Sequence, residues 1–443
     1  MPDNCVSCAV TSPPYYQKRA YGTAPQVWGD PGDCRHRWAD STVRNSRHAD
    51  DSTAGPKQKT NRGAVGGRGV RVSDTCLKCG GWRGELGQEP TASLFVAHLV
   101  ELFREVRRVL HPSGVLWLNI GDSFANDTKG PNGKAGTRLE GRPNQPAVRR
   151  SWRGDGLKKK DLIGVPWRVA LALQDDGWHL RAENIWCKAS PMPESVRDRP
   201  TVAHEHVFLL TKRGSYFYDQ EAERIPNDGR DGGGHGVRNG VDVKGGGQGN
   251  GYIGNHPAGR NLWTYWTDIR PSPFADAHFA TFPEDLPARC IRLGSSERGV
   301  CPACSAPLVR VMHRRGSPRT GQAVKTGSTT LRPSSQDQRP NGATLAAWKA
   351  ANPDRFMGWK PSCQCDAGDP VPSLILDPFA GSGTTLAVAV KLKRRALGIE
   401  LNPEYAKLAE KRLAGPLGIG GLYAPDGPVT VGLFDHLEAE APA

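Results

Sequence analysis

The chain has 443 residues with a formal net charge of +14, and only 37% of them are hydrophobic, while 53 are glycine and 36 are proline. It contains no apolar run near the roughly 20 residues that span a bilayer, and its first residues lack the basic and apolar segments of a signal peptide. We therefore expect a cytoplasmic protein with no membrane partner, long loops and a polyanionic partner such as nucleic acid.

The elements expected along the chain alternate between strands and helices. An apolar run at 6–11 predicts a buried strand, and apolar residues at helical spacing over 94–110 predict a helix that ends at 111–114. Further strands are expected at 115–120, 182–187, 205–211, 374–376 and 396–399, and helices at 165–173 and 385–393. Asn402 should cap a last helix with Pro403 at its first position. This alternation predicts an α/β fold with a mostly parallel sheet covered by helices on both faces.

Changes in composition divide the chain into core segments and polar insertions. We expect core segments at 1–28, 91–224, 261–297 and 371–443, and insertions at 29–90, 225–260 and 298–370. Residues 128–160 and 305–361 each carry ten lysines and arginines against two acids, and their composition is typical of loops that can follow a phosphate backbone. Residues 225–260 are too rich in glycine to form a packed core and are a candidate for target recognition.

Eleven cysteines without a secretion signal argue against a disulfide framework. Structural zinc prefers four thiolate or imidazole ligands, commonly from two close pairs. We therefore predict about two zinc ions per chain, stabilising insertions that have little apolar surface. Unlinked thiols and a redox Cys-x-x-Cys are the alternatives. The predicted ligands are Cys34, His36, Cys76 and Cys79 in one set and Cys301, Cys304, Cys363 and Cys365 in the other.

A strand ending at Asp377 leads into a turn with Gly381 and Gly383 and then a helix, which is the geometry that opens a nucleotide site. Glu400 follows Asp377 by 23 residues, close to the separation at which an acidic side chain can accept hydrogen bonds from ribose hydroxyls. A phosphate-loop ATPase is disfavoured because no lysine follows the second glycine. The expected cofactor-binding residues are Asp377, Pro378, Phe379, Gly381, Gly383, Thr384, Glu400 and Asn402.

The candidate catalytic residues are Ser12, Pro13, Pro14 and Tyr15. An exocyclic amine conjugated to a ring is a poor nucleophile, because its lone pair is delocalised. The Ser12 hydroxyl and the Pro13 carbonyl can each bond to such an amine, and Tyr15 can stack on a flipped base. The alternatives for this string are a rigid loop or a proline-rich ligand segment.

The two motifs in this order resemble DNA amino-methyltransferases of the permuted beta group, which use S-adenosylmethionine to methylate cytosine N4 or adenine N6. The resemblance covers most of the chain outside the polar insertions. It implies a Rossmann-like core, double-stranded DNA as partner and S-adenosylmethionine as cofactor. It also implies that Phe282, in a segment 278–283 similar to one in the family, completes the cofactor pocket. Any restriction endonuclease would be a separate protein, because no nuclease motif is present.

Serine rather than aspartate at position 12 favours cytosine N4 methylation, as the resemblance implies. Adenine N6 methylation and a zinc-containing DNA-binding protein with a weakened core are the rivals, and methylation of protein or RNA is a third. Trp186 and Lys188 could border the flipped base, although packing is favoured for Trp186. Relatives carry an acidic strand well upstream of the catalytic motif, whereas only ten residues precede Thr11 here. Residues 429–435 are a candidate to replace this strand.

Overall fold

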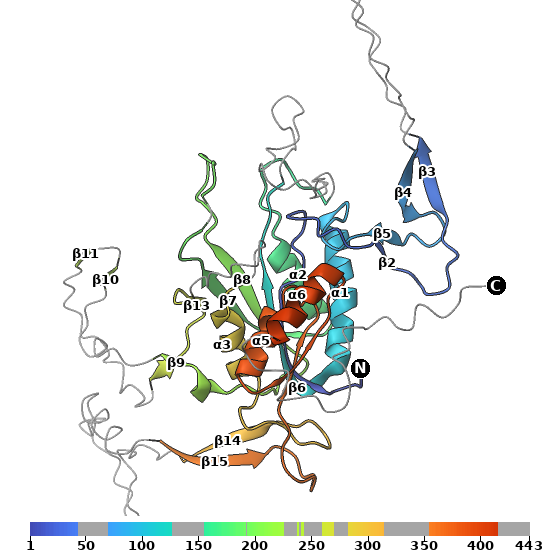
Figure 1. Cartoon of the computed structure of the whole chain (residues 1–443). Coiled ribbons are helices and arrows are strands. Elements are labelled where there is room, and N and C mark those ends of the chain that lie inside the picture. Colours follow the sequence, from blue (N-terminus) through green and yellow to red (C-terminus); the bar gives the residue numbers. More distant parts are fainter. Residues whose placement is uncertain are drawn as a thin grey trace, which may run out of the picture. The chain divides into compact units, whose positions relative to one another are not determined.

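The computed structural model describes residues 1–42, 70–125, 155–191, 193–225, 237–238, 241–242, 259–269, 282–313 and 354–414 (Figure 1). It divides into two compact units. The first comprises Met1–Pro13, Leu102–Gly121 and Pro166–Ala443, and the second comprises Pro14–Glu101 and Asp122–Val165. The candidate replacement strand at 429–435 and most of the basic loop 128–160 lie outside the described residues.

The first unit is built on a seven-stranded sheet in the order β13-β7-β8-β6-β1-β16-β17. Neighbouring strands are parallel, except that β8 runs antiparallel to both β6 and β7. The expected mostly parallel sheet is therefore confirmed. Its strands are β1 (Val6–Thr11), β6 (Leu110–Ile120), β7 (His179–Cys187), β8 (His204–Thr211), β13 (Tyr265–Trp266), β16 (Leu374–Asp377) and β17 (Arg395–Gly398).

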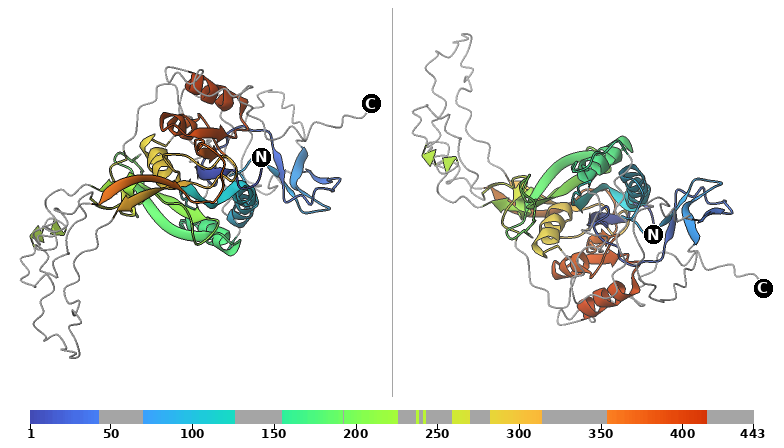
Figure 2. Two further views of the ribbon diagram at one scale, coloured as in Figure 1. Left: turned by 90° about the horizontal axis from the view of Figure 1, so that it is seen from below. Right: turned by 90° about the horizontal axis from the view of Figure 1, so that it is seen from above.

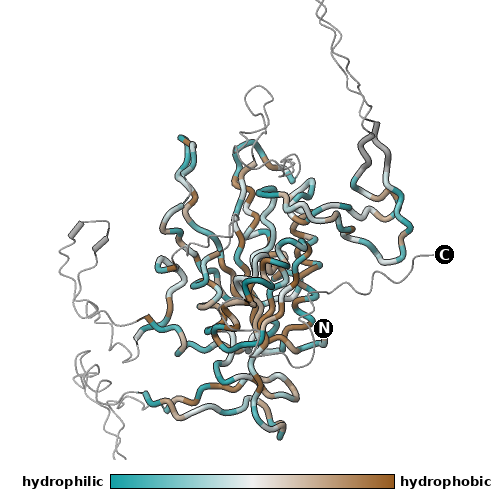
Figure 3. The backbone as a smooth tube through the Cα atoms, viewed as in Figure 1, coloured by the Kyte–Doolittle hydropathy of each residue, from teal (hydrophilic) through white to brown (hydrophobic). Residues whose placement is uncertain are grey.

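Strand β1 lies at the centre of the core between β6 and β16. All six of its residues are buried, as expected for a parallel strand with both faces covered. Apolar residues mark these central strands in Figure 3. Cys8 of β1 is fully buried and belongs to the core.

Helices cover both faces of this sheet. α3 (Asp285–Gly294) and α5 (Thr384–Lys391) share one hydrophobic cluster with alternate residues of β1, β6 and β8, and α6 (Pro403–Ala414) contacts α5. α2 (Val165–Asp175) and the end of α1 (Ala92–Val109) lie on the opposite side (Figure 2). Trp167 of α2 packs there against Phe208, with ring centroids 5.5 Å apart.

The expected helices and strands of the first unit are present, but β6 and α3 differ from the sequence prediction. Strand β6 begins at Leu110 rather than at residue 115. The register explains this, because Val6 pairs with Leu110 and Cys8 already pairs with Val115, so the residues between form an irregular step. Helix α3 was not predicted, although it packs on β1 and α5. The predicted cap is confirmed, since Asn402 Oδ1 accepts from the Glu404 N–H at 2.9 Å.

The second unit contains a small antiparallel sheet in the order β2-β5-β4-β3, together with the first part of α1. Its strands are β2 (Gln26–Trp28), β3 (Trp38–Thr42), β4 (Val70–Cys76) and β5 (Trp82–Gly84). Strands β2 and β5 have only three residues each. Strands this short contribute little apolar surface to a core.

Short elements complete the first unit. The segment 305–361 was expected as a loop, but its ends form a hairpin of β14 (Leu308–His313) and β15 (Arg355–Pro361). The expectation failed because both ends carry apolar residues that pair across the hairpin, such as Met312 with Phe356. The other pairs are β9 (Arg224–Ile225) with β12 (Arg260–Asn261) and β10 (Val237–Arg238) with β11 (Val241–Asp242), and η2 (Gln220–Ala222) is a single turn. Among the described helices, none combines the length and apolarity that crossing a membrane requires.

Candidate active site and cysteine clusters

The two sequence motifs lie side by side at the carboxyl edge of the large sheet. β1 ends at Thr11 and its parallel neighbour β16 ends at Asp377. The Thr11 hydroxyl donates to Asp377 Oδ1 at 2.6 Å, which ties the two strand ends together. Ser12 and Pro13 therefore leave the sheet beside the turn that begins at Asp377. Ligands of open α/β sheets bind at this edge.

Asp377 is an aspartate buried to 1% exposure at the start of this turn. Burial raises the pKa of its carboxyl to about 6, because the ionised form loses hydration. Hydrogen bonds from Thr11, Thr385 and the Phe379 N–H act in the opposite direction, and the Glu400 charge adds to the rise. The Phe379 N–H donates to Oδ1 at 3.1 Å, so the carboxylate also shapes the turn.

Glu400 closes the turn from the next strand. Its Oε2 accepts the Gly381 N–H and its Oε1 accepts the Asn402 N–H, both at 2.8 Å. Each carboxylate oxygen has a second lone pair that can accept a further hydrogen bond. Gly381 and Gly383 have φ angles of 54° and 76°, which glycine adopts without steric cost.

The remaining predicted cofactor residues surround this turn or support it. Pro378 is buried, and Thr384 Oγ1 accepts from Arg412 at 2.8 Å. Phe282 is partly buried and packs against the hydrophobic cluster beneath α3 and α5. Residues 278–281 of its segment lie outside the part of the chain that is described.

Beyond Pro13, the catalytic motif continues into the second unit, where its end is firmly held. The Gln17 N–H donates to the Gly87 carbonyl at 2.7 Å, and Tyr16 is buried with its ring 5.4 Å from that of Phe95. Gly87 has a φ of 91°, and a Cβ there would lie 3.3 Å from Pro14 Cβ and from the Tyr15 carbonyl oxygen. The sequence did not single out Gly87, although a glycine shortly before a helix was a usable signal.

A second polar group stands at the same edge of the large sheet. The Glu205 carboxylate accepts from Asn119 at 2.8 Å and pairs with Lys188 at 2.5 Å. Lys188 also lies 5.5 Å from the centre of the Trp186 ring, and Trp186 itself is buried, which confirms its packing role. His204 and His206 lie on strand β8. The Asn119–Glu205 contact was not foreseen, because these residues are far apart in sequence.

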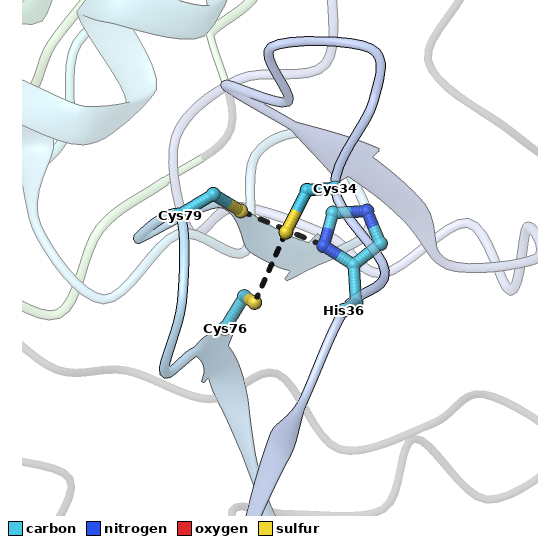
Figure 4. A group of neighbouring side chains, drawn as sticks. All are labelled: Cys34, His36, Cys76 and Cys79. Atoms are coloured by element: carbon cyan, nitrogen blue, oxygen red, sulfur yellow. Dashed lines mark hydrogen bonds between the residues drawn. The ribbon is translucent and has the colours of Figure 1, made fainter.

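The structure brings together the first predicted set of metal ligands, which we call the first cysteine cluster: Cys34, His36, Cys76 and Cys79 (Figure 4). Their ligand atoms all lie within 4.8 Å of one another. Cys34 Sγ is 4.0 Å from Cys76 Sγ, and Cys79 Sγ is 3.5 Å from His36 Nδ1. Tetrahedral zinc with bonds of about 2.3 Å to sulfur places its ligand atoms about 3.5–3.8 Å apart, so the spacing fits a metal ion.

The surroundings of this cluster also suit a metal. The backbone N–H groups of Arg37 and Lys78 point at Cys76 Sγ at 3.4 Å each. Burial by itself raises the pKa of Cys76, but the backbone N–H of Cys79, those of Lys78 and Arg37, and His36 lower it to about 5. His36 presents Nδ1 to the cluster while its Nε2 lies 3.2 Å from Asp30, which is the carboxylate partner that metal-bound histidines usually have.

The second cysteine cluster consists of Cys301, Cys304, Cys363 and Cys365 in the first unit. Its sulfur atoms also lie within 4.8 Å of one another. The Cys301 N–H donates to the Ala306 carbonyl at 2.8 Å, and the Ser305 N–H donates to the Cys301 carbonyl at 2.9 Å. Cys301 and Cys304 therefore lie in a tight turn. Backbone N–H donors, the Cys304 one first, lower the pKa of Cys301 to about 7.

These features define an α/β protein of the Rossmann-like methyltransferase class, with a glycine turn and an acidic strand end beside a Ser-Pro-Pro-Tyr loop. A DNA methylase family model matches residues 6–301 and 369–411. The chain therefore belongs to the DNA methylase family, and it is an amino-methyltransferase of the restriction–modification type.

Two curated relatives are similar over most of their length, and a third over a shorter stretch. The type II methyltransferase M.XycI of Xanthomonas campestris pv. cyanopsidis is 34% identical over 335 residues, which cover 75% of each chain. M.SmaI of Serratia marcescens is 33% identical, covering 74% of this chain and 77% of that protein. M.SfiI of Streptomyces fimbriatus is 44% identical over a shorter stretch that covers 32% of this chain and 30% of that protein.

Solved structures align more loosely. The PvuII DNA methyltransferase described as cytosine-N4-specific covers 93% of this chain and 80% of its own, at 13% identity and a TM-score of 0.41. TTHA0409 of Thermus thermophilus, a putative DNA modification methylase complexed with S-adenosyl-L-methionine, covers 94% of this chain and 87% of its own at 17% identity and a TM-score of 0.39.

Proposed function

We propose that this protein transfers a methyl group from S-adenosylmethionine to the N4 amine of cytosine in double-stranded DNA. The observation that carries the proposal is the hydrogen bond from Thr11 to Asp377, because it holds the end of β1, from which the Ser-Pro-Pro-Tyr motif continues, beside the glycine turn. Family membership supports DNA as the substrate. Serine at position 12 supports cytosine over adenine.

The chain's own groups account for activation of the amine. The Ser12 hydroxyl and the Pro13 carbonyl can accept hydrogen bonds from its two N–H groups. Such bonds draw the amine out of the ring plane and localise its lone pair, which raises its nucleophilicity. Tyr15 offers an aromatic face on which an extruded base can stack.

The glycine turn supplies the features that a nucleoside cofactor needs. Glu400 offers carboxylate lone pairs for ribose hydroxyls, and the backbone at Gly381 allows close approach because no atom lies nearer than 4.0 Å to a Cβ built there. The cofactor supplies an electrophilic methyl group on a sulfonium. Catalysis by the protein then consists of orienting the amine and excluding water.

Four further assignments accompany this proposal. Both cysteine clusters bind zinc, as their ligand spacing supports. The basic segments of the chain provide contacts to the phosphate backbone. A separate restriction endonuclease and a cytoplasmic location follow from the type of system to which the family members belong.

Mass analysis of nucleosides tests the reaction. Purified protein is incubated with methyl-labelled S-adenosylmethionine and DNA of mixed sequence, and the DNA is digested and analysed. We expect labelled N4-methylcytosine, and its formation should fall at least about 10²-fold in Ser12→Ala, because an oriented amine is lost. Labelled N6-methyladenine as the sole product refutes the base assignment, and cofactor binding without transfer favours the rival of a weakened DNA-binding protein.

A further inference from the structure

In the small sheet of the second unit, the indole rings of two tryptophans stack on a buried histidine. Trp28 of β2 and Trp82 of β5 stand directly opposite each other in the antiparallel ladder. Their rings lie 5.1 Å and 5.5 Å from the ring of His98, with planes only 20° apart in both cases. His98 belongs to α1 and is 2% exposed. We call Trp28 and Trp82 the indole pair.

A chain of hydrogen bonds leads from His98 to the end of the catalytic motif. His98 Nδ1 lies 3.0 Å from Glu89 Oε1, and Glu89 is fully buried. Glu89 Oε2 accepts the Gly87 N–H at 2.8 Å, and the Gly87 carbonyl accepts the Gln17 N–H at 2.7 Å. A buried carboxylate is stable only when such partners are present, so each link constrains the next.

The first cysteine cluster ties together the strands that bear the indole pair. Cys34 and His36 lie in the connection from β2 to β3, whereas Cys76 and Cys79 lie at the turn from β4 to β5 (Figure 4). The Cys76 N–H donates to the Gly81 carbonyl at 2.7 Å, immediately before Trp82. A Cβ on Gly81 would lie 3.2 Å from the Trp28 carbonyl oxygen, so the two indole strands approach closely there.

The sheet needs such a tie because it has little core of its own. β2 and β5 contribute three residues each, and Val27 of β2 is exposed. A bound metal adds free energy of folding that apolar burial does not supply in small elements. The fit of the four ligand atoms and the Asp30 carboxylate behind His36 indicate where that ion binds.

We propose that a zinc ion held by Cys34, His36, Cys76 and Cys79 positions residues 14–17 of the catalytic loop through the indole pair, His98, Glu89 and Gly87. The zinc acts through these links within the second unit. The inference deepens the proposed function, because it makes orientation of the base depend on a metal outside the cofactor turn.

An experiment independent of activity tests the coupling first. Cys79→Ser is compared with Cys5→Ser, a cysteine outside both clusters, by metal analysis and by hydrogen–deuterium exchange of the full-length protein. We expect Cys79→Ser to lose one zinc per chain and to speed exchange in peptides covering residues 14–18, where the Gln17 amide is bonded. Loss of the metal without faster exchange there overturns the proposal, and so does finding no metal in the unmutated protein.

Kinetics with labelled S-adenosylmethionine and DNA provide the second test. We expect kcat to fall about 10²-fold in Cys79→Ser while the dissociation constant for S-adenosylmethionine changes less than about twofold, because only the base-binding loop is misplaced. Trp82→Ala should lower kcat while retaining the zinc, and Trp82→Phe, which keeps a stacking ring, should restore most of it. An unchanged kcat in zinc-free Cys79→Ser overturns the proposal.

The two tests separate failure of this inference from failure of the proposed function. If the unmutated protein methylates no DNA but the exchange of residues 14–18 still depends on zinc, the proposed reaction is wrong and the coupling stands. If methylation is normal and independent of the metal, the reaction stands and the coupling is wrong.

Discussion

Gly383 and Gly381 allow a sharp test of how the glycine turn is packed. Both have positive φ angles, 76° and 54°, so replacement by alanine imposes a left-handed conformation at either position. Their surroundings differ. A Cβ on Gly383 would lie 2.9 Å from Ala409 Cβ and 3.2 Å from Ala409 Cα on α6, whereas the nearest atom to a Cβ on Gly381 is 4.0 Å away.

The expected cost follows from these distances. The left-handed conformation costs an alanine roughly 1–2 kcal/mol, and this applies to both variants. The overlap with Ala409 adds about 1–3 kcal/mol at Gly383 alone, which is the usual range for overpacking. We therefore expect Gly383→Ala to lower the free energy of unfolding by about 2–5 kcal/mol and Gly381→Ala by about 1–2 kcal/mol.

Urea unfolding followed by far-ultraviolet circular dichroism measures the difference between the two variants. Ala409→Gly in the Gly383→Ala background removes the methyl group that overlaps, so the cost of the Gly383 change should shrink in a double-mutant cycle. Equal destabilisation by the two glycine changes, or additive behaviour with Ala409→Gly, would refute the packing argument.

Three other changes test the buried Asp377, its hydrogen bond from Thr11, and the second cysteine cluster. Burial raises the pKa of Asp377 to about 6 from its ordinary value of 3.8, so its stabilising contribution is present below about pH 4 and lost as the pH rises through 6. Asp377→Asn should abolish this part of the pH dependence of the free energy of unfolding, about 3 kcal/mol. Unfolding curves recorded from pH 4 to 7 measure it. Thr11→Val removes the donor to Asp377 and should cost about 1–3 kcal/mol in the same assay, with a pH dependence steeper than that of the unmutated protein. Cys363→Ser should release one zinc per chain on metal analysis and speed proteolysis within β14 and β15, whereas an unchanged zinc content would contradict metal binding by the second cysteine cluster.

The sequence predicted the elements of the large sheet well, because buried parallel strands are short apolar runs and their helices have clear periodicity. β1 occupies the predicted residues and α6 begins where Asn402 and Pro403 indicated. The ends of 305–361 were assigned to a loop, because single-sequence composition there is dominated by the polar residues between the two strands. Helix α3 was missed for a similar reason, since a proline within it, Pro287, disguises its apolar face.

The two cysteine clusters show what spacing can and cannot predict. Close pairs such as Cys76 and Cys79 signal a metal knuckle locally, but which pairs join is decided by the fold. In this chain the antiparallel pairing of β3 with β4 brings Cys34 and His36 to Cys76 and Cys79, across the residues 43–69 that the structure does not describe. The predicted pairing of the ligands agrees with the geometry, and occupancy by zinc stays a prediction.

The amino-acid sequence alone determined the chemistry available to this protein. Short strings of adjacent residues carry the amine-binding groups and the glycine turn, because the conformation of such a motif depends mainly on its own few residues. Tertiary structure alone decided their meeting at one edge of a sheet, the hydrogen bond from Thr11 to Asp377 across 366 residues, and the path from the first cysteine cluster to Gly87. Contacts between distant residues depend on strand order and register, and these are set by burial summed over the whole core and not by any local pattern.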